Sequence, residues 1–135
     1  MYMDTFVISD LHLSDSEPKH QKRPLWKKFK QKDYFYDDSL YNFINYIQKQ
    51  TDKSCELVLN GDIFDFDSVM SIPSNINFPI KKYEYTMGLN PMEVKSIFKI
   101  TKILEEHDLF VKALQNFLKN KNKLIFIIGN HDLEL

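Results

Sequence analysis

The fold is decided by a stretch that reads KLIFIIGNHD at residues 123–132. Its apolar part, Leu124 to Ile128, has the length and composition of a buried strand, and Gly, Asn, His and Asp follow it directly. Two other apolar runs end in a similar way. Thr5 to Ile8 precedes Asp10-Leu11-His12, and Leu57 to Leu59 precedes GDIFD at residues 61–65. The sequence therefore predicts three strands, each of which is followed by Asp, Asn or His.

Helices are predicted between these strands. Apolar residues recur at helical spacing over residues 40–47, and an acidic residue or serine at positions 37–39 can cap the start of that helix. Helical spacing returns over residues 94–104 and 110–118, with a break near His107 and with Asp108 as the expected cap. The order strand, helix, strand, helices, strand predicts an α/β fold with three parallel strands and right-handed helical crossovers.

The polar motifs are expected to share one site, because the carboxyl ends of parallel strands line a common crevice. Carboxylate oxygens mixed with imidazole suit a divalent metal ion, and two such ions suit phosphate ester hydrolysis. Asp10 and His12 can reach one ion, and Asp62 can bridge two ions that lie about 3.5–4 Å apart. Asn130 offers a neutral oxygen ligand, and the glycines before Asp62 and Asn130 permit close backbone approach.

The third motif also offers groups for proton transfer. His131 can donate a hydrogen bond or a proton to a leaving oxygen, and Asp132 can orient the His131 ring.

Asp-x-His, Gly-Asp-x-x-Asp and Gly-Asn-His-Asp, in this order after three strands, resemble the calcineurin-like metallophosphoesterase family. The resemblance implies that the chain forms the first half of that family's α/β sandwich. It places Asp10 and His12 on a first metal ion, Asp62 between both ions, and Asn130 on the second. It further implies that His131 acts at the transition state or the leaving group, with Asp65 and Asp132 as supporting partners.

The family pattern continues with a lone histidine and then Gly-His-x-His, and His20 and His107 do not occupy those positions. The domain, residues 1–135, is therefore expected to be incomplete. A second resemblance, carried by residues 91–135 and the basic segment 24–30, is to a bacterial subgroup of the same family with no assigned substrate.

Two long connections leave the predicted strand ends. The first, residues 14–37, has seven Lys or Arg and no acid between Lys19 and Lys32. It is either a solvated loop or an anion-recognition lid, in which Arg23, Lys27 and Lys28 would contact substrate phosphate. Trp26 and Phe29 in this loop allow base stacking or contact with a lipid headgroup region. The second connection, residues 66–91, is either a disordered insertion or a cap over the same crevice.

The bulk composition restricts the class of protein. A chain of 135 residues with a net charge of −1 shows no general bias towards polyanions, and its one cysteine, Cys55, cannot form an internal disulfide. We find no signal peptide and no run long enough to span a membrane, so the expected location is the cytoplasm.

The predicted function is hydrolysis of a phosphomonoester or phosphodiester by a metal-bridging hydroxide at a dinuclear site. The two ions would be Mn²⁺, Fe or Zn²⁺, among which the ligand types do not choose. One alternative is a truncated, non-catalytic fragment that binds metal weakly or associates with a partner, either a second copy or the missing C-terminal half. Another is a phosphodiesterase directed at nucleotides or nucleic acid.

Overall fold

The three predicted strands form one parallel sheet. The computed structural model describes residues 3–75 and 77–135. Its strands are β1 (Thr5–Ile8), β2 (Glu56–Asn60) and β3 (Lys123–Ile127), in the order β1-β2-β3. All pairings are parallel, with Val7 opposite Val58 and Val58 opposite Ile125. The α/β prediction with three parallel strands and helical crossovers is therefore confirmed, and β3 ends one residue before the apolar run does.

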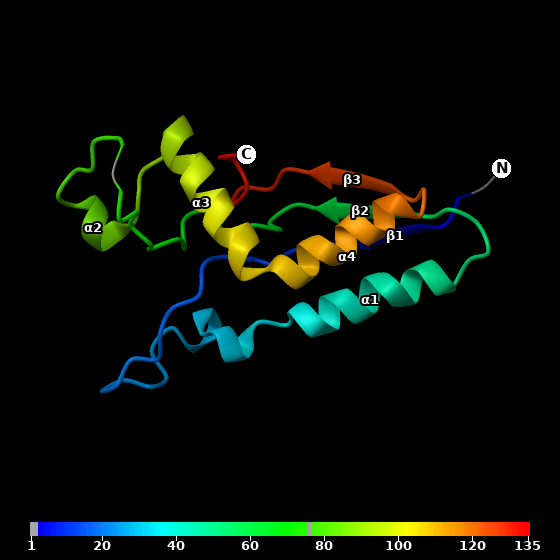
Figure 1. Ribbon diagram of the computed structural model, residues 1–135, viewed down its shortest axis with the longest axis horizontal. Helices are drawn as coiled ribbons and strands as arrows, with labels where there is room; N and C mark the ends of the chain where they lie inside the picture. Colours follow the sequence, from blue (N-terminus) through cyan, green and yellow to red (C-terminus); the bar gives the residue numbers. More distant parts are fainter. Residues whose placement is uncertain (1–2, 76) are drawn as a thin grey trace.

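Two helices cover one face of this sheet. Helix α1 (Asp37–Lys49) and helix α4 (Asp108–Lys119) pack side by side, with α1 the lower of the two in Figure 1. Helix α3 (Glu93–Glu106) precedes α4 and lies beyond the carboxyl ends of the strands (Figure 1). Three shorter elements are the helix α2 (Glu84–Met87) and the 3₁₀ turns η1 (Lys28–Lys30) and η2 (Lys32–Tyr34).

The strand register separates the two faces of the sheet. Side chains alternate along a strand, so every second residue of β1, β2 and β3 points towards the helices. These residues belong to the hydrophobic core with α1 and α4: Phe6, Ile8, Leu57, Leu59, Leu124 and Phe126. On the opposite face Val7 is 58% exposed and Ile127 is 47% exposed. The core thus lies between the sheet and the helix pair.

The predicted helix caps were wrong. Helix α1 begins at Asp37 with Tyr36 in the N-cap position, and no side chain caps it. Helix α4 begins at Asp108, so that His107 takes the N-cap position. At α1, Asp37 has another partner, because its carboxylate accepts from His107 Nδ1 at 2.9 Å.

Buried ion pairs hold both long connections in place. In the first, Lys30 is 2% exposed, and its ammonium lies 3.0 Å from Asp15 Oδ1 and 3.0 Å from Glu17 Oε1. In the second, Glu84 is fully buried and its carboxylate lies 2.7 Å from Lys95 Nζ in α3. Both connections therefore have charged anchors that neither the solvated-loop nor the disordered interpretation anticipates.

Candidate metal centre

Backbone hydrogen bonds bring the three motifs together beyond the strand ends. Asp10 N–H donates to the Gly61 carbonyl at 3.1 Å, and His12 N–H donates to the Asp62 carbonyl at 2.9 Å. Gly61 N–H donates in turn to the Ile127 carbonyl of β3 at 2.9 Å. The parallel pairing thus continues past the strands, and it places the motifs side by side as the sequence predicts.

Three of the predicted ligands have unusual backbone conformations. Asp10, His12 and Asp62 have φ values of 57°, 49° and 52°, in the left-handed region. Few residues other than glycine adopt this region, although Asp and His do so more often than most. Such strain, which costs of order 1–3 kcal/mol per residue, accumulates at functional sites. The conformation turns the side chains out of the strand alternation and towards a common point.

A glycine at the end of β3 makes room for the Asp62 carboxylate. A Cβ atom on Gly129 would lie far inside contact distance of Asp62 Oδ1. The same carboxylate oxygen accepts a hydrogen bond from the His131 backbone N–H at 2.9 Å. Asp62 therefore lies between the ends of β2 and β3, which only glycine at position 129 permits.

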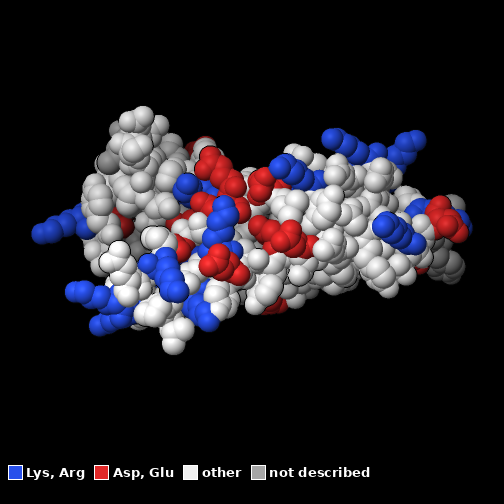
Figure 2. Space-filling model, turned by 60° about the horizontal axis from the view of Figure 1, so that its bottom comes forward, with Lys and Arg blue, Asp and Glu red and all other residues white. Residues whose placement is uncertain are grey.

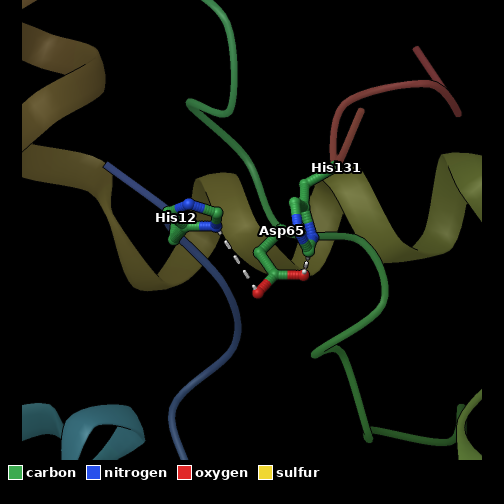
Figure 3. Close-up of side chains that lie close together, drawn as sticks. All are labelled: His12, Asp65 and His131. Carbon is green, nitrogen blue, oxygen red and sulfur yellow. Dashed lines mark ion pairs between the residues drawn. The ribbon is translucent and has the colours of Figure 1, made fainter. Parts of the chain in front are cut away.

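The side chains at the strand ends form two groups that could each hold a metal ion. One group is Asp10, His12 and Asp62, and the other is His12, Asp65 and His131. In each group the nitrogen or oxygen donors lie within 4.8 Å of one another. Figure 3 shows the second group, with Asp65 between the two imidazole rings. The two groups share His12, so together they form one continuous cluster.

The donors of this cluster lie too far apart to satisfy one another. His12 Nε2 lies 3.9 Å from Asp10 Oδ1, and His12 Nδ1 lies 3.9 Å from Asp65 Oδ2. His131 Nδ1 lies 3.4 Å from Asp65 Oδ1, and this buried nitrogen has no hydrogen-bond partner among the described residues. Hydrogen bonds are usually 2.7–3.2 Å long. A cation with ligands at about 2.0–2.2 Å would fit between donors at these separations, so the residues present suit a divalent metal.

The structure corrects the role predicted for Asp132. Asp132 is completely buried, and its carboxylate accepts from the backbone N–H groups of Phe64 at 2.6 Å and of Ile63 and Gly129 at 3.2 Å. Asp65, not Asp132, lies beside the His131 ring. Asp132 therefore joins the ends of β2 and β3 and does not orient the imidazole. The sequence favoured Asp132 because it is adjacent to His131 in the chain, whereas Asp65 belongs to a different motif.

Ser68 and Lys30 support Asp65, although the sequence analysis did not identify them. Ser68 donates to Asp65 from its hydroxyl at 2.6 Å and from its backbone N–H at 3.1 Å. Lys30 Nζ donates to the Ser68 carbonyl, so the basic loop, which is the first connection (residues 14–37), is joined to the cluster. The Asp-x-x-Ser spacing is a known local turn signal and could have indicated Ser68. No local pattern points to Lys30.

The remaining site predictions are placed as follows. Asn130 lies at the end of β3 with an exposed side chain, and its role as a ligand stays a prediction. Lys27 Nζ pairs with Glu17 at 3.2 Å, and Lys28 Nζ lies 4.5 Å from the centre of the Tyr34 ring. Arg23 is exposed. No ion pair or hydrogen bond among the described residues joins these three cations to the strand-end motifs.

Charge on the visible face is not gathered into a basic stripe. Figure 2 shows Lys and Arg side chains at both ends of this face and most Asp and Glu side chains nearer its middle. This distribution agrees with the net charge of −1. It gives no particular support to a long polyanion as the partner.

His107 and Cys55 lie outside the cluster. His107 is fully buried, with Nε2 at 2.9 Å from the Ser14 carbonyl and Nδ1 at 2.9 Å from Asp37, so both ring nitrogens have structural partners. Cys55 is also fully buried, and burial together with the nearby Asp4 carboxylate raises the pKa of its thiol. A raised pKa makes the thiol a poor nucleophile at neutral pH.

Comparisons with known proteins identify the family. In the part of the chain that the structure describes, no helix is long and apolar enough to cross a membrane. Neither the curated proteins nor the solved structures contain a significant match to this chain. One family model, that of the calcineurin-like phosphoesterases, matches residues 3–135 and so covers all three strand-end motifs. The match is to the family as a whole, and the narrower bacterial subgroup stays a prediction. The chain belongs to the calcineurin-like phosphoesterase family, whose members are metal-dependent hydrolases of phosphate esters.

Proposed function

We propose that the strand-end cluster binds two divalent metal ions and hydrolyses a phosphomonoester or phosphodiester. The observation that carries this proposal is the meeting of Asp10, His12 and Asp62 from two strands, with donors within 4.8 Å of one another. Family membership supports the same reaction class.

Each ligand position in the proposal follows from the geometry or from the family resemblance. Asp10, His12 and Asp62 would hold the first ion. Asp62 lies against the end of β3 and would share the second ion with Asn130. When bound, the ions activate a water molecule and neutralise charge on the phosphate. Mn²⁺, Fe and Zn²⁺ all accept mixed oxygen and imidazole ligands.

His131 is the proposed proton donor. Its Nδ1 faces Asp65 Oδ1 at 3.4 Å, and the Ser68 hydroxyl holds the other oxygen of the same carboxylate at 2.6 Å. A carboxylate on this side favours the tautomer that keeps a proton on Nδ1 of a neutral ring. Protonation of the ring would then place a transferable proton on Nε2, available to a leaving oxygen.

One observation favours a second candidate function. The two donor groups share His12. A single metal ion could therefore occupy one of the two groups while the other stays empty. A chain that binds one ion and does not hydrolyse esters is therefore the alternative. The number of ions bound per chain separates the two functions.

The test combines metal analysis with hydrolysis. The purified chain would be loaded with Mn²⁺, its metal content measured, and p-nitrophenyl phosphate and bis-p-nitrophenyl phosphate assayed as substrates. We expect two ions per chain and metal-dependent release of p-nitrophenol. Asp62→Asn should lower the rate by more than about 100-fold, because a ligand is expected to matter more than its supporting partners do.

Asparagine is chosen for Asp62→Asn because it suits the backbone conformation at this position. Asn tolerates the left-handed conformation of position 62, so the variant should keep its fold. Asp52→Asn, at an exposed carboxylate in the α1–β2 connection, is the control and should retain full activity. Equal activity in Asp62→Asn and the unmodified protein would rule out the assignment. One ion per chain with no hydrolysis would favour the alternative.

A further inference from the structure

A cavity of about 260 Å³ adjoins the metal centre, and His12 forms part of its wall. The other residues that matter here are four aromatic side chains from the end of the basic loop: Phe29, Tyr34, Phe35 and Tyr36. The turns η1 and η2, which carry two of them, lie before α1 at the end of the molecule towards which the strands point (Figure 1). The cavity and the metal centre therefore meet at one residue.

The rim of this cavity is unusually apolar for a surface. Phe29 is 69% exposed and Tyr36 is 71% exposed, although neither contributes to the hydrophobic core. Single exposed apolar residues are common, but aromatic residues gathered around a cavity mark a binding site. Flat rings at the rim offer faces on which another flat ring can stack.

The size and charge of the cavity limit what it can accept. Pockets that bury a whole drug-sized ligand measure about 300–1,000 Å³, so 260 Å³ suits one ring system and not a larger group. The Lys28 ammonium lies 4.5 Å from the ring centre of Tyr34, one of the residues that line the cavity, so a positive charge is close to the cavity. A matching ligand has a planar ring and a negatively charged phosphate close to it.

We propose that this cavity binds the planar aromatic group of a phosphate ester whose phosphate lies at the strand-end cluster. The inference rests on the proposed function, because it names the substrate class of the same site. A nucleobase and a phenyl ring share the required chemistry. In this arrangement Phe29 and Tyr36 stack on the ring, and His12 separates the ring from the phosphate.

The test measures binding without metal as well as hydrolysis with metal. Adenosine 5′-phosphate and ribose 5-phosphate have the same phosphate and leaving alcohol and differ only in the base. Without metal, we expect the nucleotide to bind about tenfold or more tightly, as stacking on an aromatic side chain predicts. With Mn²⁺, the ratio of their kcat/KM values should show a similar preference.

Two exposed aromatics provide the variants, and two others provide the controls. Phe29→Ala and Tyr36→Ala should each reduce the preference for the nucleotide over ribose 5-phosphate at least severalfold. Trp26→Ala, in the same loop, and Tyr46→Ala, on α1, should keep it, because those side chains are 55% and 58% exposed but do not line the cavity. Circular dichroism would verify that all four variants are folded.

The two hypotheses can fail separately. If neither ester is hydrolysed but the nucleotide binds preferentially and Phe29→Ala abolishes this, the proposed function fails and the cavity assignment stands. If both esters are hydrolysed equally and bind equally, the assignment to a nucleobase is overturned and the function stands. A preference for phosphotyrosine over phosphoserine in binding would then identify a phenyl ring as the source. Equal binding of all four compounds would overturn the cavity proposal altogether.

Discussion

The strand-end cluster and the ion pair that anchors the 66–91 connection use carboxylates in different ways. In the anchor, the Glu84 carboxylate has Lys95 Nζ at 2.7 and 2.9 Å and the backbone N–H groups of Lys81 and Asn90 at 2.7 and 2.8 Å. In the cluster, the closest contacts between the imidazole ring nitrogens and the carboxylates are 3.4–3.9 Å.

The difference separates structural charge from functional charge. A buried carboxylate with several donors at hydrogen-bond distance has all its hydrogen bonds made. It stabilises the fold only if that set of donors is complete. Carboxylates and imidazoles that approach without bonding still have ligand positions to offer. Removal of the first kind should affect stability, and removal of the second kind should affect metal binding. The predictions that follow test this separation, from the largest expected loss of stability to the smallest.

Asp132→Ala should cause the largest loss of stability. It would leave the buried N–H groups of Ile63, Phe64 and Gly129 without their acceptor. At about 1–3 kcal/mol for each unsatisfied group, the free energy of unfolding should fall by about 3 kcal/mol or more. Urea denaturation would measure the change, with Asp52→Ala as the exposed control. An unchanged denaturation midpoint would show that Asp132 is not structural.

Glu84→Gln should reduce stability at neutral pH and change its pH dependence. The hydrogen bond from Lys95 and those from the backbone lower the pKa of Glu84 from 4.5 to about 2. Because the folded pKa is depressed, the stabilisation is fully present above about pH 4.5. It is lost as pH falls from there through about pH 2.

Thermal unfolding between pH 2 and pH 7 would measure this effect. The melting temperature of the unmodified protein should fall more steeply between pH 4.5 and pH 2 than that of Glu84→Gln. Glu93→Gln, at an exposed carboxylate in the first turn of α3, serves as the control and should retain the steep fall. Parallel curves for the unmodified protein and Glu84→Gln would contradict the assignment.

Ser68→Ala should have a smaller effect on stability and a clear one on metal affinity. The variant loses the 2.6 Å hydroxyl hydrogen bond to Asp65, which is worth about 1 kcal/mol. Asp65 Oδ2 lies 3.9 Å from Nδ1 of His12, a proposed ligand, and loss of a group that holds a ligand's partner lowers metal affinity by about 10–100-fold. Titration with Mn²⁺ would measure this, beside Ser74→Ala as a control from an exposed site in the same connection. Equal affinity in both variants would mean that Asp65 needs no support.

Asp10→Asn should have the smallest effect on stability without metal. The Asp10 side chain is 68% exposed, and Asn accepts the φ of 57° at this position. Stabilisation by metal should largely disappear. An ion at 100 times its Kd stabilises a folded protein by about 2.7 kcal/mol. Melting temperatures with and without Mn²⁺ would compare the two proteins, and a metal-induced shift that survives in Asp10→Asn would exclude Asp10 as a ligand.

Much of the fold was predictable because each strand has a local signature. The apolar runs before Asp10, Asp62 and Asn130 are strands, and helical spacing locates α1, α3 and α4 to within a few residues. The caps were less predictable. Asp37 has the right residue type to cap α1, but it binds His107, which lies 70 positions away. Local preference cannot anticipate a competitor from another part of the chain.

The same limit applies to the metal centre. Parallel strands bring their carboxyl ends together, so the convergence of the three motifs follows from their order alone. Which carboxylate lies beside His131 does not follow. Asp132 is adjacent in the chain but points to backbone N–H groups, and Asp65 reaches the ring from β2.

The sequence by itself thus determined the family, the parallel α/β sheet and the residues that meet at its edge. These features depend on local periodicity and on motif order, both of which can be read along the chain. Tertiary structure alone decided that Lys30 and Lys95 are buried and that four aromatic side chains form a cavity beside His12. These features depend on contacts between segments that are distant in sequence, where packing and the satisfaction of buried charge select the partners.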